Sequence, residues 1–138
     1  MDHDAYPRDY PREILKAVKT IAVVGASPNE ARPSFGVMKF LIARGYTVIP
    51  INPGQAGKEI LGQPVYATLA DVPQTIDMVD IFRASDAVEG VVHEAMALSS
   101  RPKVVWMQLD VRNDQAAAFA ESFGTKVIMN RCPAIELR

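Results

Sequence analysis

The segment Gly25-Ala26-Ser27 follows a short apolar run and opens a loop that extends to Ser34. Glycine permits a tight turn and lets a diphosphate group approach the backbone closely. Ser34, or a residue beside it, is expected to begin a helix, and the free N–H groups and positive dipole of a helix start favour an anion. Arg32 lies in the same loop and can pair with a phosphate. The loop therefore predicts a phosphate-binding site rather than an ordinary solvated connection.

Short apolar runs recur along the chain and alternate with segments of helical spacing. The runs are mostly continuous, which is typical of strands buried on both faces of a parallel sheet. The predicted strands are Ile21–Val24, Thr47–Ile51, Met78–Phe82, Val104–Met107 and Lys126–Met129. Helical spacing is found over residues 11–16, 35–42, 88–98 and 116–123. Asp86 and Glu89 resemble a capping box for the third of these helices, and Asn113 opens the fourth.

This alternation predicts a Rossmann-like, doubly wound α/β fold. We expect a mostly parallel sheet of five strands, or slightly more, with helices on both faces. Residues 54–75, rich in glycine and proline, are expected to form a crossover with at most a short helix near 69–72. Residues 1–138 are expected to form one domain, with residues 1–10 as a polar arm on its surface. Ligands of such folds bind outside the carboxyl ends of the strands, near the topological switch point.

The residues at the predicted strand ends discriminate among nucleotides. A dinucleotide fingerprint has three glycines, in G-x-G-x-x-G, and a carboxylate about twenty residues further on. Here Ser27 occupies the second glycine position, and Asn52-Pro53 follows the second strand in place of an acid. NAD is therefore disfavoured, whereas NADP and coenzyme A, which both carry a phosphorylated ribose, remain open. The chain lacks G-x-x-x-x-G-K-[ST], which disfavours an ATPase.

The composition is that of a globular protein with a net charge of −1. This charge does not indicate a nucleic-acid binder or a membrane-surface protein. No apolar run approaches the length of a membrane span, and residues 1–12 lack the apolar core of a signal peptide, so we expect a cytoplasmic protein. The single cysteine, Cys132, is expected to be a small buried residue. No metal-ligand spacing or Ser-His-Asp order is found, and Asp77 and Asp80 are expected to serve loops and caps.

Several motifs in register resemble one known family. They are Ile21–Pro28 (IAVVGASP), Arg32-Pro33-Ser34, Gly45–Pro53 (GYTVIPINP), Ile60-Leu61-Gly62, Val79–Arg83 (VDIFR), Val105–Gln108 (VWMQ) and Asn130–Pro133 (NRCP). Together they are similar to the small single-domain CoA-binding proteins, which are related to the N-terminal domain of the succinyl-CoA synthetase α subunit. The resemblance covers residues 16–137.

The resemblance implies a coenzyme A site across the strand ends. Gly25, Ala26 and Ser27, with Arg32, Pro33 and Ser34, would surround the diphosphate. Asn52 and Pro53 would flank the adenosine, and Lys58 would offer charge to the 3′-phosphate. Phe82 and Arg83 would line the path of the adenine or pantetheine, and Gln108 is a further candidate contact. The chain departs from the family pattern at Asp110, often glycine in the family, and at Asn130, commonly aspartate.

The resemblance also bears on catalysis. The synthetase relatives carry a phosphorylated histidine in a second domain that this sequence does not contain, and no catalytic constellation replaces it. We therefore expect a binding, carrier or regulatory protein for coenzyme A or an acyl-CoA. The alternatives are an NADP-dependent oxidoreductase-type protein and a CoA-responsive protein-interaction module. The sequence leaves open whether the chain forms a homo-oligomer, binds a protein partner or prefers a particular acyl group.

Overall fold

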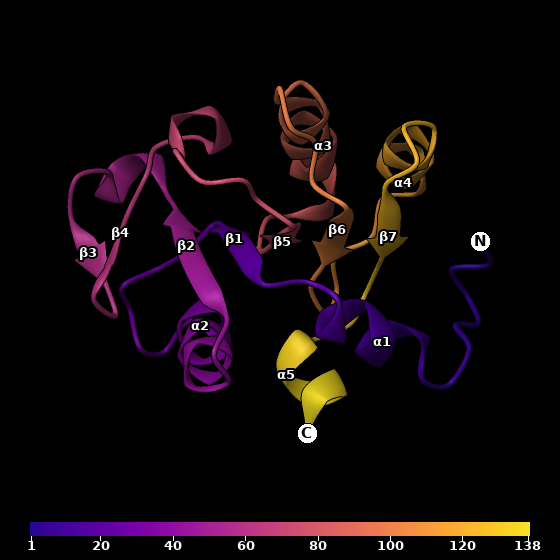
Figure 1. Ribbon diagram of the computed structural model, residues 1–138, viewed down its shortest axis with the longest axis horizontal. Coiled ribbons are helices and arrows are strands. Elements are labelled where there is room, and N and C mark those ends of the chain that lie inside the picture. Colours follow the sequence, from indigo (N-terminus) through magenta and orange to yellow (C-terminus); the bar gives the residue numbers. More distant parts are fainter.

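Five strands pair in parallel to form the central sheet of the computed structural model, which describes residues 1–138 (Figure 1). The strands are β1 (Thr20–Val24), β2 (Thr47–Ile51), β5 (Met78–Ile81), β6 (Val104–Met107) and β7 (Lys126–Ile128). Their order in the sheet is β2-β1-β5-β6-β7, and every neighbouring pair runs in parallel. The predicted doubly wound α/β fold is confirmed, and each strand lies within a residue of its predicted bounds.

Helices cover both faces of this sheet, and each face has its own apolar core (Figure 1). One layer contains α1 (Tyr10–Lys16), α2 (Pro33–Ala43) and α5 (Pro133–Leu137). The other contains α3 (Val88–Met96) and α4 (Asp114–Glu121). The strands are buried on both sides, which explains their continuous apolar sequences. None of the helices is both long enough and apolar enough to span a membrane.

Two helix starts test the predicted caps. Asn113 caps α4 as predicted, since its side chain accepts a hydrogen bond from the N–H of Ala116. The capping box predicted for Asp86 and Glu89 is wrong. Asp86 lies in a 3₁₀ turn, Ser85–Ala87, and α3 begins after Ala87 without a side-chain cap. The 3₁₀ turn leads directly into α3, so the helix start is positioned by backbone rather than by a capping side chain.

The glycine- and proline-rich crossover contains more structure than predicted. It forms a two-stranded antiparallel hairpin of β3 (Glu59–Ile60) and β4 (Gln63–Pro64), flanked by 3₁₀ turns at Pro53–Gln55 and Leu69–Asp71. Tyr66 then pairs with the outer edge of β2, because its N–H donates to the Pro50 carbonyl and its carbonyl accepts from the Asn52 N–H. The hairpin segment thereby occupies an edge that would otherwise expose unpaired backbone groups.

The N-terminal arm is fixed against the other end of the sheet. The Tyr6 hydroxyl accepts a hydrogen bond of 2.8 Å from the N–H of Met129, the residue after β7. His3 contacts both the Tyr6 hydroxyl and the Glu121 carboxylate, at 2.7 and 3.2 Å. The arm lies on the surface, where aromatic contacts and hydrogen bonds attach it.

Two carboxylates, one just before β5 and one within it, have opposite environments. Asp77 precedes β5, and its carboxylate accepts hydrogen bonds from the N–H groups of Lys19 and Thr20, each at 3.0 Å. Asp80 lies within β5, is 0% exposed, and has no hydrogen-bond partner for either carboxylate oxygen. The prediction that Asp80 serves a loop or cap is therefore wrong. It is a core residue between the strand neighbours Val23 and Trp106.

These environments move the two pKa values in opposite directions. Burial raises the pKa of Asp80 well above the usual carboxyl range. Desolvation also acts on Asp77, but the two backbone N–H groups and the charge of Lys103 outweigh it and lower the pKa of Asp77. Asp80 therefore keeps its proton in the folded state at pH values where the unfolded chain loses it.

The wild-type protein should lose stability as pH rises above about 4, the ordinary aspartate pKa. The Asp80→Asn variant should not show this loss, because the asparagine side chain does not titrate. Above that pH the unfolded state binds fewer protons at this position than the folded state, so the free energy of unfolding falls by up to about 1.4 kcal/mol per pH unit. Urea denaturation at pH 5 and pH 8 measures the difference. Asp77→Asn is the matched control and should instead destabilise at neutral pH, with the effect fading in acid. Equal pH slopes for Asp80→Asn and the wild type would contradict the assignment.

Candidate functional site

A cleft of ≈600 Å³ lies at the carboxyl ends of the strands, where the loops after β1, β2, β5 and β6 meet. The chain leaves β1 toward β2 on one side and later enters β5 on the other, so the cleft includes the topological switch point. Nine of the eleven residues predicted from sequence line it: Gly25, Ala26, Ser27, Arg32, Pro33, Ser34, Asn52, Phe82 and Arg83.

Gly25 allows the loops after β1 and β5 to approach each other. Its φ is +86°, which side-chain-bearing residues rarely adopt. A Cβ at this position would lie 2.5 Å from the Phe82 carbonyl oxygen and 3.2 Å from Cδ of Arg83. Only glycine fits here without displacing backbone.

The three residues of the glycine turn use their N–H groups within the protein. Gly25 and Ala26 both donate to the Ile51 carbonyl, and Ser27 donates to the Ser34 hydroxyl, at 3.1, 3.3 and 3.1 Å. These bonds fasten the turn to the end of β2 and to the start of α2. The turn thus contributes space and shape to the cleft, while donors for an anion must come from other groups.

Such donors lie at the start of α2. The N–H of Ser34, in the first helical turn, donates to no protein acceptor, and the positive end of the helix dipole adds to its effect. Arg32 immediately precedes the helix, and Arg83 approaches from the loop after β5. Both arginines are exposed and form no ion pair. One acidic residue, Asp110, also lines the cleft, and it too has no ionic partner.

Asn52 has a structural task in the cleft wall. Its amide nitrogen donates to the Ala26 carbonyl at 2.7 Å, and its amide oxygen accepts from the Gly54 N–H at 2.8 Å. With both ends of the amide in use, Asn52 ties the end of β2 to the glycine turn. The position carries no carboxylate that would repel a phosphorylated ribose.

Two predicted site residues lie outside the cleft lining. Pro53 begins the 3₁₀ turn after β2 and is exposed. Lys58 lines a separate hollow of ≈440 Å³ beside the β3–β4 hairpin, together with Glu59 and Asp71. The chain turns away from the cleft after Asn52, so nearness to Asn52 in sequence does not bring Lys58 to it.

The loop after β6 supplies cleft residues that were mostly missed from sequence: Gln108, Leu109, Asp110 and Val111. Gln108 was considered only as a candidate contact. Its side-chain oxygen is buried and has no hydrogen-bond partner, although the residue borders the cleft. Leu109 is 45% exposed and presents an apolar surface. The left-handed Asp110, with φ +67°, is held by a 2.7 Å bond from its N–H to the Asn130 side chain.

Residues near the last strand serve the core. Trp106 is fully buried, and its indole N–H donates to the Arg131 carbonyl at 2.9 Å. Cys132 is buried in the same apolar layer, as predicted. No group of three or more His, Cys, Asp or Glu side chains in the molecule is placed to hold a metal ion.

Comparisons with known proteins identify the family and match the fold of this chain. A family model described as a CoA binding domain matches residues 19–138. YneT of Bacillus subtilis strain 168 is 36% identical over 121 residues, which are 88% of this chain and 87% of YneT. ADP-forming acetate–CoA ligase I of Archaeoglobus fulgidus is 29% identical over 122 residues, and the matched part is 83% of this chain but 18% of the ligase. The solved structure of a hypothetical protein from Pyrococcus horikoshii OT3 matches with a TM-score of 0.88 and 37% identity, over 96% of this chain and 91% of that one.

Gly25→Ala should destabilise the fold by roughly 2–4 kcal/mol, because the new methyl group both occupies a left-handed conformation and overlaps the Phe82 carbonyl. Gly36→Ala is the matched control, since Gly36 is a helical glycine of α2 with nothing within 4 Å of an added Cβ. It should leave stability unchanged or increase it by about 1 kcal/mol. Chemical denaturation of both variants measures the difference. Equal effects at the two positions would show that the contact with Phe82 is unimportant.

Proposed function

This chain belongs to the CoA binding domain family, and from that membership we propose that its strand-end cleft binds coenzyme A or an acyl-CoA. The observation that carries the proposal is the junction of Gly25 with Phe82, which opens a cleft bordered by two unpaired arginines and the start of α2. An anionic, elongated ligand suits this combination. The volume of ≈600 Å³ is in the usual range for small-molecule sites.

The residues present suit the parts of coenzyme A. Arg32, Arg83 and the free N–H of Ser34 would hold phosphate oxygens by charge-assisted hydrogen bonds. The exposed side chain of Leu109 and the ring of Phe82 would contact the less polar portions. The unpaired Gln108 oxygen would accept a hydrogen bond from an N–H of the ligand, which would relieve the cost of a buried acceptor without a partner.

We propose a binding, carrier or regulatory role, and not catalysis by this chain alone. The chain spans 18% of the archaeal ligase that it matches, so the proposal extends only to ligand binding. The side chains around the cleft provide two arginines, two amides, two serine hydroxyls, the Asp110 carboxylate and apolar surface. No hydrogen bond joins either hydroxyl to that carboxylate, so the lining holds no paired nucleophile and base. A role as an NADP-binding oxidoreductase-type protein is the alternative that the first experiment separates.

Coenzyme A should raise the melting temperature of the protein by several degrees. A ligand present at one hundred times its dissociation constant stabilises the folded state by about 2.7 kcal/mol. Acetyl-CoA should act similarly, 3′-dephospho-CoA less, and NAD little. Differential scanning fluorimetry with these ligands and with NADP measures the order. A larger shift with NADP than with coenzyme A would overturn the proposal.

Arg32→Ala should weaken coenzyme A binding by roughly ten- to a hundredfold, since a hydrogen bond between charged groups contributes about 1.5–3 kcal/mol. Isothermal titration calorimetry measures the dissociation constant. Arg8→Ala is the control, because Arg8 is exposed in the N-terminal arm and lies outside the cleft lining. Unchanged affinity in Arg32→Ala, or equal weakening in both variants, would remove Arg32 from the site.

A further inference from the structure

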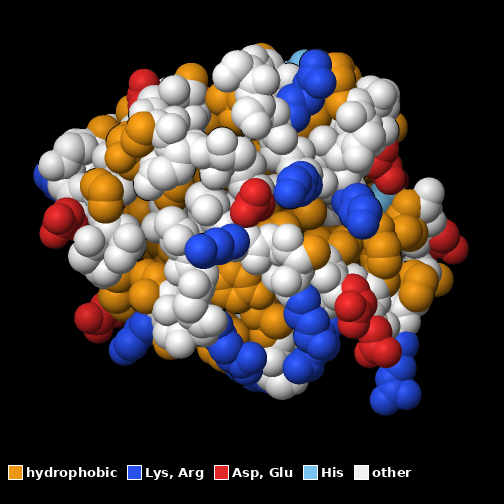
Figure 2. All heavy atoms as spheres, viewed as in Figure 1, with side chains coloured by type: hydrophobic (Ala, Val, Ile, Leu, Met, Phe, Trp, Pro, Cys, Tyr) orange, Lys and Arg blue, Asp and Glu red, His pale blue; other side chains and the backbone are white.

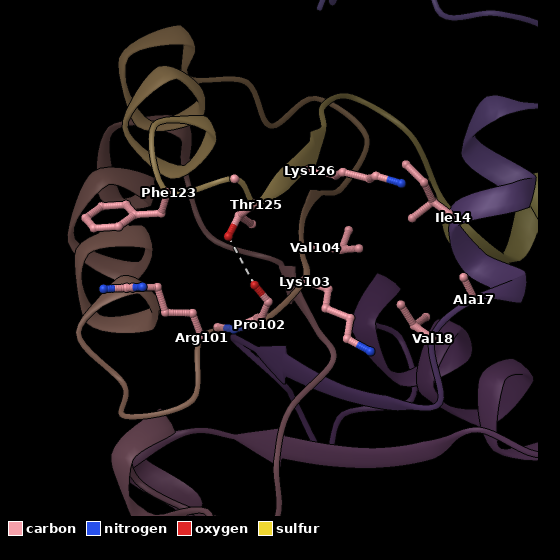
Figure 3. A pocket seen from close by; sticks show the side chains of 11 residues that line it. Ile14, Ala17, Val18, Arg101, Pro102, Lys103, Val104, Phe123, Thr125 and Lys126 are labelled. Carbon is pink, nitrogen blue, oxygen red and sulfur yellow. Dashed lines mark hydrogen bonds between the residues drawn. The ribbon is translucent and has the colours of Figure 1, made fainter.

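A second hollow lies at the amino ends of the strands, opposite the strand-end cleft, where β6 and β7 begin (Figure 3). It has a volume of ≈420 Å³ and shares no residue with the strand-end cleft. Val104 and Lys126, the first residues of the two strands, line it, and Ile14 and Val18 line it on the side of α1. We call it the amino-edge hollow.

The charged side chains that line the amino-edge hollow are all positive. They are Arg101, Lys103 and Lys126, and none of the three forms an ion pair. An acid outside the lining, Asp77, acts electrostatically with Lys103. Its carboxylate is already bonded to the backbone N–H groups of Lys19 and Thr20. Like charges around one hollow repel each other, and a bound anion would relieve that repulsion.

The two lysines are held close together by the sheet. The N–H of Lys126 donates to the Lys103 carbonyl at 3.0 Å, which joins the chain segments that carry them. In Figure 3 both lysine side chains extend toward α1, with Val104 between them and the apolar side chains of Ile14 and Val18 opposite. An anionic group between the lysines would therefore have apolar surface beside it.

Arg101 forms the other end of the amino-edge hollow. Its Nε donates to the Met96 carbonyl at 3.1 Å, and its guanidinium lies over the Phe123 ring, 4.5 Å from the ring centre. These two contacts fix its orientation, while its terminal nitrogens have no acceptor in the protein. Thr125 also lines the hollow, and its hydroxyl donates a hydrogen bond to the Pro102 carbonyl (Figure 3).

The surface next to the amino-edge hollow also carries positive side chains. A neighbouring hollow of ≈310 Å³ shares Val18 with the amino-edge hollow, and its lining contains four cations and no acid. Figure 2 shows Lys and Arg side chains across the middle and lower part of one face of the molecule, with several acidic side chains among them. Seven of the 15 Lys and Arg residues line these two hollows: Arg12, Lys16, Lys19, Arg44, Arg101, Lys103 and Lys126.

We propose that the amino-edge hollow is a second ligand site, which binds a small organic anion: a phosphate or carboxylate carried on an apolar body. Lys103 and Lys126 hold the anionic group, and the apolar body packs against Ile14, Val18 and Val104. The concave shape and the apolar wall favour a small ligand over an extended polyanion, which needs charge alone. The site is independent of the strand-end cleft and does not rest on coenzyme A binding.

Phenyl phosphate and benzoate are the probes, titrated into ¹⁵N-labelled protein and followed by the backbone amide signals. We expect saturable shifts at Lys103, Val104 and Lys126 with at least one probe, and the tighter probe identifies the preferred anionic group. The double variant Lys103→Gln/Lys126→Gln should weaken that binding at least tenfold. Saturating coenzyme A, and Arg32→Ala, should leave it unchanged.

The control variant is Arg8→Gln/Lys39→Gln, which removes the same charge from two exposed residues outside both hollows and the cleft. Equal weakening in the control would show a general charge effect and overturn the site. Absence of saturable shifts with both probes, or shifts confined to the cleft loops, would do the same. If inorganic phosphate bound as tightly as phenyl phosphate, the proposed contribution of the apolar wall to affinity would be wrong. If oligothymidine bound more tightly than either probe, the ligand would be a polyanion and not a small organic anion. The spectra report directly whether each variant is folded.

Discussion

The strand-end cleft depends on one steric constraint, the contact between Gly25 and the Phe82 carbonyl. No side chain fits there, since a Cβ would lie 2.5 Å from that oxygen. The same turn is fastened to β2 by two N–H bonds to the Ile51 carbonyl and by the Asn52 amide. Three loops that follow β1, β2 and β5 are thereby fixed relative to one another. The chain runs from β1 to β2 on one side of the sheet and returns to β5 on the other, so the topological switch point lies between β1 and β5. The fixed junction therefore lies beside the cleft, which the two arginines and the start of α2 border.

Most of the fold could be predicted because burial on both faces leaves a strong mark on sequence. Each of the five strands reads as an apolar run, and left-handed Gly45, with φ +93°, follows α2. The elements that were missed are very short. Helix α5 has five residues, too few for a helical period, although Pro133 at its start was an available signal. Strands β3 and β4 have two residues each, joined by Leu61-Gly62, and leucine rarely occupies a left-handed turn position.

The candidate site was predictable where its residues are local in sequence, and less so where the tertiary structure selects them. The loop from Gly25 to Ser34 carries its own signals, whereas the loop after β6 reaches the cleft only because β6 lies beside β5. Lys58 was predicted to lie at the cleft because it is near Asn52 in sequence, but the tertiary structure separates the two. The backbone after Asn52 turns toward the hairpin, where the Gly57 N–H donates to the Val65 carbonyl. Asp80 shows a further limit, because an acid inside an apolar strand gives no sequence signal of whether it is paired.

The amino and carboxyl ends of the strands in a parallel sheet differ in their electrostatics. This difference explains some of the cations at the amino ends of the strands and leaves others without a partner. Helix N-termini lie near the carboxyl edge, where α2 presents its positive end to the cleft. Helix C-termini, which are negative, lie near the amino edge and account for cations there: Lys16 ends α1, Arg44 follows α2, and Arg101 donates to the last residue of α3. Lys103 and Lys126 have no such partner, because they stand at the starts of strands, whose dipoles are small. Neither lysine forms an ion pair, although Asp77 offsets part of the charge of Lys103. Positive charge that no helix end uses therefore remains at the amino-edge hollow, where it favours a bound anion.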